Sequence, residues 1–215
     1  MEGGAVSFTT AQQAHVRIMR AVLASLQDSP LVLKGGTALL LCYGLDRFSE
    51  DLDFDAPKKM NLESRLEKAL SGIVASQTIT RTKDTDTVQR YRVIYQVEEG
   101  EGRLKIEVSC RDEMLPETIV VEDGIKTYRV ASLAAQKVRA FEGRTAARDL
   151  YDLHFLIRHH RGALSKDTMT RLRQAVGNLN QVEGRFRPAF EEDDLFRDRA
   201  AMVSTLLLEI QEAVR

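Results

Sequence analysis

Hydrophobic positions along this chain change their spacing near Val130. Before it, segments with an apolar residue every three to four positions, the period of a helix, are interleaved with short apolar or alternating segments, the pattern of strands. The expected helices are residues 10–26, 37–43 and 62–74, and the expected strands are residues 31–33, 89–96, 104–109 and one within 48–54. This order predicts a sheet with helices packed against it.

After Val130 the apolar spacing is helical throughout. Ser132 is the expected N-cap of the first of these helices, Gly143 is its expected stop, and Pro188 lies in an expected polar connection. The expected helices are residues 132–141, 145–159, 166–179 and 195–214. We therefore predict an α+β fold, with a mixed-sheet core over residues 1–130 and a helical C-terminal part over residues 131–215.

Composition limits the possible classes of protein. The 215 residues are 43% hydrophobic and 29% charged, with a formal net charge of -1, which is typical of a globular domain and excludes a uniformly basic nucleic-acid binder. Apolar runs are too short for a membrane span, and the N-terminus lacks a signal-peptide pattern, so we expect a cytoplasmic protein without membrane association. The two cysteines, Cys42 and Cys110, lack the spacing of a zinc or disulfide framework.

Charge is uneven along the chain despite the near-zero total. Between Lys137 and Arg173 there are nine Lys or Arg residues and four Asp or Glu residues. Such a stretch attracts phosphate, although ordinary solvated helix faces would give the same count.

Asp51 and Asp53 form the first candidate for chemistry. In a strand, alternate side chains point to opposite faces, so the two carboxylates share one face while Leu52 and Phe54 occupy the other. Two adjacent carboxylates repel each other unless a cation lies between them, and Mg²⁺ prefers carboxylate oxygens together with retained waters. The pair therefore suggests a magnesium site, with an exposed acidic strand as the alternative.

A glycine turn precedes this pair by about fifteen residues. Lys34, Gly35, Gly36 and Thr37 connect an expected strand to an expected helix, and the two glycines leave the backbone open to close approach. Backbone N–H groups at a helix N-terminus bind phosphate, and Thr37 adds a hydroxyl donor. The spacing is not that of a P-loop. An ordinary glycine turn is the alternative, but together with the acids the turn suggests a site for a triphosphate and a metal.

Further candidates lie downstream. Glu107 and Lys105 lie on the same face of an expected strand. That face is either solvent-exposed or lines a cleft. Lys137 falls inside the apolar arc of its helix, so it extends either to water or into an active cleft. Asp149 falls inside the next apolar stripe near its edge, and Asp152 lies just outside it. Asp149 complements the helix dipole as an early-helix acid, or either acid pairs with Lys137 or Arg148 and positions the substrate.

These motifs resemble the AbiEii/AbiGii toxin family of nucleotidyltransferases, which includes the MenT toxins and resembles the wider polymerase-β-like superfamily. The resemblance is carried by residues 33–39 (LKGGTAL), 47–54 (RFSEDLDF), 104–109 (LKIEVS), 137–140 (KVRA) and 148–153 (RDLYDL). It implies that Glu107 completes a metal site with Asp51 and Asp53. It also implies active-site roles for Lys137 and for acids at the last motif, Asp149 and Asp152.

Arg47 and Ser49 precede the acidic pair and are candidates for phosphate contact together with Lys34, Gly35, Gly36 and Thr37, because arginine suits bidentate contacts to oxyanions. A structural ion pair of Arg47 with Asp46 or Glu50 is the alternative.

The resemblance also implies a function. Members of the family are toxins of toxin–antitoxin pairs, and some add nucleotides to the 3′ end of tRNA and so block translation. We therefore expect a Mg²⁺-dependent enzyme that transfers a nucleoside monophosphate from an NTP, releases pyrophosphate, uses a tRNA acceptor and has a cognate antitoxin. The alternatives are transfer to a protein or a small molecule, and an inactive binding module.

Overall fold

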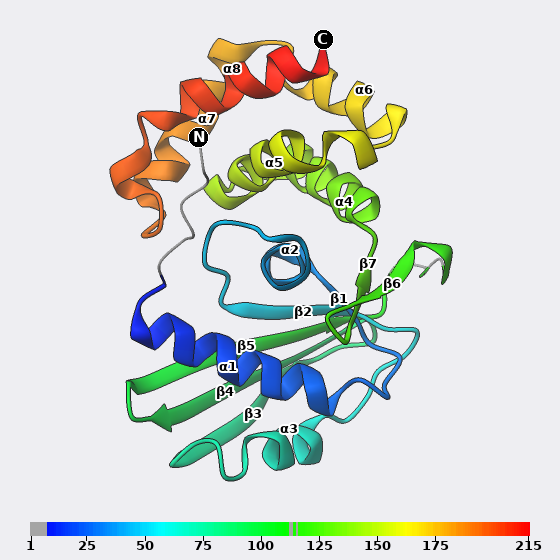
Figure 1. Ribbon diagram of the computed structural model, residues 1–215, viewed down its shortest axis with the longest axis vertical. Helices are drawn as coiled ribbons and strands as arrows, with labels where there is room; N and C mark the ends of the chain where they lie inside the picture. Colours follow the sequence, from blue (N-terminus) through cyan, green and yellow to red (C-terminus); the bar gives the residue numbers. More distant parts are fainter. Residues whose placement is uncertain (1–7, 112–113, 115) are drawn as a thin grey trace. The chain divides into compact units, whose positions relative to one another are not determined.

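The computed structural model describes residues 8–111, 114 and 116–215. The chain divides into two compact units, Met1–Arg129 and Val130–Arg215. The first contains the sheet and the second is helical (Figure 1).

The described part of the first unit contains a seven-stranded sheet with the order β3-β4-β5-β2-β1-β7-β6. Its strands are β1 (Val32–Lys34), β2 (Asp51–Asp55), β3 (Ser76–Asp84), β4 (Val88–Val97), β5 (Gly100–Ser109), β6 (Ile119–Glu122) and β7 (Ile125–Tyr128). The pairs β2–β5 and β1–β7 are parallel and the others are antiparallel. The predicted α+β fold with a mixed sheet is therefore confirmed.

Alternation places the core on one side of the central strands. Leu52 and Phe54 of β2 are buried, whereas Asp51 and Asp53 remain half-buried on the other face. In β5 the aliphatic residues Leu104, Ile106 and Val108 are all buried. The predicted faces of both strands are present, because period-2 patterns place apolar side chains on a single face.

Helices cover both faces of the sheet but over different strands. α1 (Thr10–Ser25) and α3 (Glu63–Leu70) pack against one face of β3, β4 and β5, where Tyr91 donates a hydrogen bond to the Met60 carbonyl just before α3. α2 (Gly35–Tyr43) packs on β1, β2 and β7, and Figure 1 shows it on the side of the sheet away from α1.

Several boundaries in the first unit differ from the sequence prediction. α2 begins at Gly35 rather than Thr37, because glycine adopts the positive φ of 75° with which this helix begins. α3 ends at Leu70, and β5 starts at Gly100. The strands β3, β6 and β7 were not predicted, since two are only four residues long and β3 is a largely exposed, polar edge strand.

The second unit consists of α4 (Val130–Gly143), α5 (Ala147–His160), α6 (Lys166–Ala175), α7 (Leu179–Glu192) and α8 (Met202–Val214), with short 3₁₀ turns at Arg161–Ala163 and Arg197–Arg199. The prediction of Ser132 as an N-cap is wrong, since α4 starts two residues earlier. The prediction of a polar connection around Pro188 is also wrong. Pro188 lies inside α7, where Val182, Phe186 and Phe190 are buried at helical spacing. Their packing offsets the roughly 3 kcal/mol cost of an interior proline.

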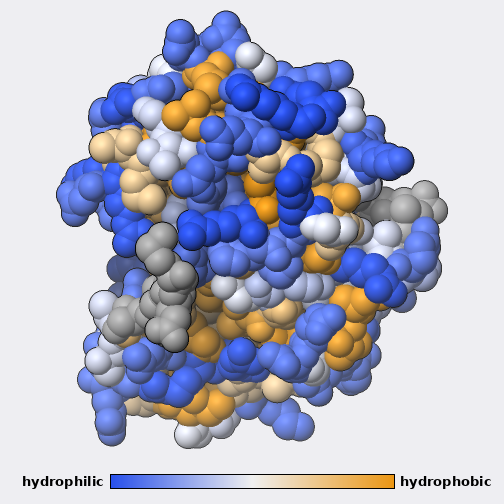
Figure 2. Space-filling model, turned by 45° about the horizontal axis from the view of Figure 1, so that its top comes forward, coloured by the Kyte–Doolittle hydropathy of each residue, from blue (hydrophilic) through white to orange (hydrophobic). Residues whose placement is uncertain are grey.

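The surface is mostly hydrophilic in the view of Figure 2, with apolar residues in small groups. Among the described residues, no helix combines the length and apolar character needed to cross a bilayer.

Candidate functional site

The acidic residues of β2 lie at the centre of the sheet. β2 pairs with β1 on one side and with β5 on the other, so that Asp53 lies opposite Lys34 and Glu107, and Asp51 lies opposite Lys105. Directly opposed residues on paired strands project from the same face. The sheet register thus places Asp51, Asp53 and Glu107 on one face of two neighbouring strands.

The glycine turn lies against this acidic face. A Cβ atom added to Gly35 would be 3.1 Å from Oδ2 of Asp53, so no side chain separates the carboxylate from the backbone at the start of α2. The positive φ of Gly35, 75°, makes the position additionally unfavourable for any other residue. The bare backbone of the turn and the carboxylate are therefore in direct contact.

Gly36 is packed by the residues that precede the acidic pair. A Cβ on Gly36 would lie 2.7 Å from Nη2 of Arg47 and 3.0 Å from Oγ of Ser49. Arg47 and Ser49 are buried, and Nη1 of Arg47 donates to the Phe48 carbonyl at 2.9 Å. Both side chains thus support the turn from within the protein.

Thr37 connects the two halves of the site. Its side chain is buried, and its hydroxyl donates to the backbone carbonyl of Asp51 at 2.5 Å and lies 2.9 Å from Oγ of Ser49. The hydroxyl is therefore engaged inside the protein, and it ties the first turn of α2 to the start of β2.

Lys34 is directed along β2 to a third aspartate that the sequence analysis did not single out. Its Nζ lies 2.5 Å from Oδ1 of Asp55, and Tyr128 donates a hydrogen bond to the other oxygen at 2.9 Å. Asp55 is buried. Lys34 therefore neutralises Asp55, which leaves its neighbour Asp53 with less compensating charge.

The electrostatics of the acidic face favour a cation. Burial raises the pKa of Asp53, Lys105 lowers it in part, and the negative charges of Asp51 and Glu107 raise it further. Burial opposes the charged form of Lys105, but Asp51, whose Oδ2 lies 2.5 Å from its Nζ, outweighs this, so that the pKa of the lysine is raised. With Lys105 and Arg90 as its cations, the group of Asp51, Asp53 and Glu107 still carries more negative than positive charge.

Glu107 is held by Arg90 of the adjacent strand. Nε and Nη2 of Arg90 lie 2.9 and 2.7 Å from Oε2 of Glu107. Within the described ranges, no three or more His, Cys, Asp or Glu side chains gather into a group that could hold a metal ion. Mg²⁺, however, is commonly held by one or two carboxylates together with waters and substrate phosphates. Asp51 and Asp53 fit that requirement as a pair.

Lys137 of α4 forms a buried ionic cluster within the second unit. Its Nζ lies 3.1 Å from Oδ1 of Asp149 and 2.6 Å from Oδ2 of Asp152, both on α5. Arg144 also binds Asp149, with Nε 2.6 Å from Oδ2, whereas Arg148 is directed to Asp193. The lysine in the apolar stripe thus has two buried carboxylates of α5 as partners rather than water.

The charge state of this cluster follows from its contacts. Burial alone would raise the pKa of Asp149, but the hydrogen bonds from Arg144 and the charge of Lys137 outweigh it and place the pKa below its ordinary value. Asp149 is therefore ionised at neutral pH and depends on both cations for its charge.

A buried histidine that no sequence pattern predicted supports the start of β2. Nε2 of His15 lies 2.8 Å from the backbone carbonyl of Glu50, the residue before Asp51, and Nδ1 lies 2.6 Å from the hydroxyl of Tyr95. Because a carbonyl only accepts hydrogen bonds, Nε2 carries the proton. Tyr95 in turn lies over Gly102, where an added Cβ would be 2.2 Å from its ring. His15 thus links α1 and β4 to the acidic strand.

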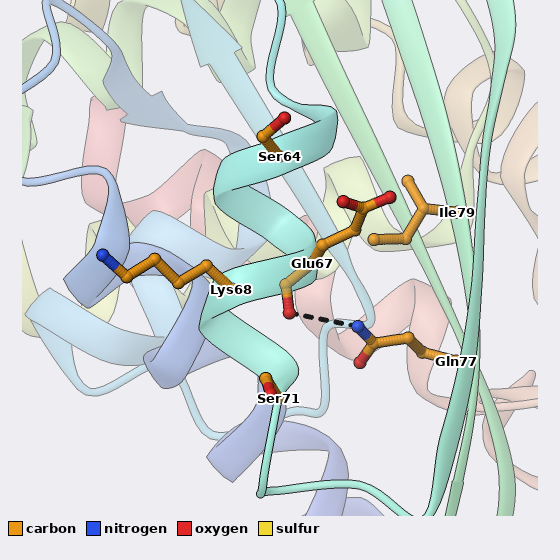
Figure 3. A pocket seen from close by; sticks show the side chains of 6 residues that line it. All are labelled: Ser64, Glu67, Lys68, Ser71, Gln77 and Ile79. Atoms are coloured by element: carbon orange, nitrogen blue, oxygen red, sulfur yellow. Dashed lines mark hydrogen bonds between the residues drawn. The ribbon is translucent and has the colours of Figure 1, made fainter.

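A separate depression of about 550 Å³ lies between α3 and β3. Figure 3 shows the Nε2 of Gln77 bonded to the Glu67 carbonyl at 3.0 Å. The lining residues are Ser64, Glu67, Lys68, Ser71, Gln77 and Ile79. They carry no acidic pair, and they lie on the face of the sheet opposite to Asp51 and Asp53.

Comparisons with known proteins show the family to which the chain belongs. Residues 17–213 match the family described as nucleotidyl transferase AbiEii toxin, type IV toxin–antitoxin system. The chain belongs to the AbiEii family. Its reaction is therefore nucleotidyl transfer, and the family implies an NTP substrate and an antitoxin partner.

Solved structures include similar proteins. The crystal structure of JHP933 from Helicobacter pylori is 35% identical, with 97% of this chain and 92% of that chain covered and a TM-score of 0.88. A putative nucleotidyltransferase from H. pylori is 34% identical, with 96% and 94% covered and a TM-score of 0.87. MenT4, a nucleotidyltransferase toxin from Mycobacterium tuberculosis, shares the fold at 18% identity, with 96% and 84% covered and a TM-score of 0.55. A search of curated proteins gave no match.

Proposed function

We propose that this AbiEii nucleotidyltransferase transfers a nucleoside monophosphate from a Mg²⁺-bound NTP to the 3′ end of a tRNA and thereby inhibits translation. The observation that carries the proposal is the contact between the Asp53 carboxylate and the bare backbone of Gly35, with Asp51 on the same face. A metal-binding carboxylate pair beside a phosphate-binding helix N-terminus is what NTP chemistry requires.

In this proposal the chain holds the nucleotide mainly through its backbone. The N–H groups of Gly36 and Thr37 in the first turn of α2 donate to triphosphate oxygens, where the helix dipole adds partial positive charge. Arg47 and Ser49 act from behind the turn by packing against Gly36. Lys34 holds Asp55 and so contributes to the charge balance of the site.

Asp51 and Asp53 would hold the magnesium ion. When bound, Mg²⁺ neutralises phosphate charge and makes the α-phosphorus more electrophilic. The acceptor hydroxyl oxygen then forms a bond to the α-phosphorus, the bond from that phosphorus to the β-bridging oxygen breaks, and pyrophosphate leaves with the electron pair. Glu107 accepts the hydroxyl proton, which requires that Arg90 release part of its hold on the carboxylate.

The proposal also includes the ion cluster of Lys137, Asp149 and Asp152. Its support is the geometry of the cluster and the family resemblance. The ammonium group of Lys137 is nearly buried and held by two carboxylates, so its orientation is fixed. Asp149 and Asp152 act as positioning residues for that lysine.

The tRNA acceptor, inhibition of translation and a cytoplasmic location rest on the resemblance to toxins that modify tRNA 3′ ends. The cation-rich segment from Lys137 to Arg173 is consistent with a polyanionic acceptor.

Transfer of label from α-labelled NTP to total RNA or total protein, with and without EDTA, tests the proposal. Asp51→Asn and Asp53→Asn should lower Mg²⁺-dependent transfer to RNA by at least about 10²-fold. Asp86→Asn, which changes an exposed acid in the β3–β4 turn, serves as the matched control and should be unaffected. Sequencing of tRNA ends then identifies the acceptor. Label in protein instead of RNA would refute the acceptor, and full activity of Asp53→Asn would refute the site.

A further inference from the structure

One face of the strands β3, β4 and β5 carries a group of cations beside the acidic pair. We call it the basic sheet face and define it by Lys83, Arg90, Arg92, Arg103 and Lys105. Arg92 and Arg103 are exposed and the other three are half-buried.

The sheet register places these residues in rows that begin at the acids. Residues directly opposite each other on paired strands lie on one face, so each row can be followed from strand to strand. The first row runs Asp51, Lys105, Arg92 and Thr80, and the second runs Asp53, Glu107, Arg90 and Lys83. Both rows extend from the centre of the sheet to its edge strand, β3.

Helices of the first unit pack on the opposite face of these three strands. α1 reaches that face through the His15–Tyr95 contact, and α3 lies beside Tyr91. Figure 3 shows Gln77 and Ile79 of β3 directed toward α3, so the alternating residues Thr78 and Thr80 point to the basic sheet face. Both threonines are exposed and offer hydroxyl donors.

Two of the cations are not neutralised by neighbours. Arg90 pairs with Glu107, Lys105 pairs with Asp51, and Arg103 makes an exposed pair with Glu101. Over the described ranges 8–111, 114 and 116–215, neither Arg92 nor Lys83 forms an ion pair. These two residues therefore give the outer part of the face a net positive charge.

We propose that the basic sheet face binds the sugar–phosphate backbone of the acceptor nucleic acid and leads its 3′ end toward Asp51 and Asp53. This inference rests on the proposed function. Its support is charge complementarity: cations and hydroxyl donors, the groups that contact phosphate, line rows that end at the proposed reaction centre.

The chemistry of the face also sets the mode of binding. Tyr91 and Tyr95 of β4 are buried on the opposite face, so no aromatic side chain of β4 is presented for base stacking. Binding therefore occurs through phosphates, depends strongly on salt and is insensitive to base sequence.

Fluorescence anisotropy with a labelled single-stranded RNA of about 12 nucleotides, titrated at several salt concentrations, tests the proposal. Each phosphate contact to single-stranded nucleic acid adds about 0.7 to the slope of log K against log salt, which is about 5-fold in affinity at 0.1 M. Arg92→Gln should lower the slope by about 0.7. The double variant Lys83→Gln/Arg92→Gln should lower it by about 1.4 and weaken binding about 25-fold.

Lys68→Gln is the matched control, because Lys68 is an exposed cation of α3 on the opposite side of the sheet. The salt dependence of RNA binding by this variant should have the same slope as that of the wild type. Thermal unfolding checks that each variant is folded. Label transfer is recorded on the same RNA. Wild-type protein that binds RNA through these cations but transfers no label supports the basic sheet face and refutes the proposed function. Unchanged slopes in the double variant, or binding of poly-glutamate in place of RNA, overturn the inference.

Discussion

Gly35 and Gly44 offer a matched test of the contact on which the site depends. Both have a φ of 75°, but a Cβ on Gly35 would lie 3.1 Å from Asp53 Oδ2, whereas a Cβ on Gly44 would meet nothing within 4 Å. Alanine in this left-handed region costs about 1–2 kcal/mol. Gly35→Ala and Gly44→Ala should therefore destabilise the protein by similar amounts, measured as the shift of the urea unfolding midpoint.

Only Gly35→Ala should impair the reaction. The added methyl group requires the Asp53 carboxylate to retreat by a few tenths of an ångström. If a displacement of 1 Å costs about 10²-fold, a few tenths correspond to about 4-fold in kcat. Steady-state transfer assays on both variants measure this. An unchanged kcat in Gly35→Ala, or an equal fall in Gly44→Ala, would show that the contact between turn and carboxylate does not matter for catalysis.

Three further predictions concern buried polar groups. Lys137→Met leaves the carboxylates of Asp149 and Asp152 without their shared cation. This change should lower the free energy of unfolding, measured by urea denaturation, by about 3–5 kcal/mol. A change below about 1 kcal/mol would contradict a stabilising role of Lys137 in this cluster. Because the pKa of Asp149 is depressed in the folded state, its contribution is present above its ordinary pKa and is lost as pH falls through the lowered value. Asp149→Asn should remove that pH dependence from the unfolding free energy, and an unchanged profile would argue against it. His15→Ala leaves the hydroxyl of Tyr95 and a backbone carbonyl without their partner, so it should cost about 1–3 kcal/mol and lower kcat more than KM changes; His15→Gln should restore part of both, and no rescue would count against a positioning role.

Local patterns were sufficient to predict the elements that carry the chemistry. The alternation in Asp51-Leu52-Asp53-Phe54 predicted one acidic and one buried face, and both are present because strand periodicity is set by the backbone itself. The same reasoning held for Leu104 to Ser109. The motifs around the turn and the acids were specific enough to suggest the family before any fold was known.

Tertiary structure decided which residues meet. The order of the strands places Glu107 and Lys105 beside the acids, and nothing local in the sequence specifies that β5 rather than β4 adjoins β2. His15 reaches Glu50 across 35 residues of chain. The polar connection predicted around Pro188 is wrong because the aromatic packing that keeps α7 helical is long-range, as in the stacking of Phe186 on Phe141. The spacing of apolar residues predicts which side chains of one segment lie on the same face. Ion pairs and hydrogen bonds between distant segments depend instead on strand pairing and helix packing, which the whole chain determines.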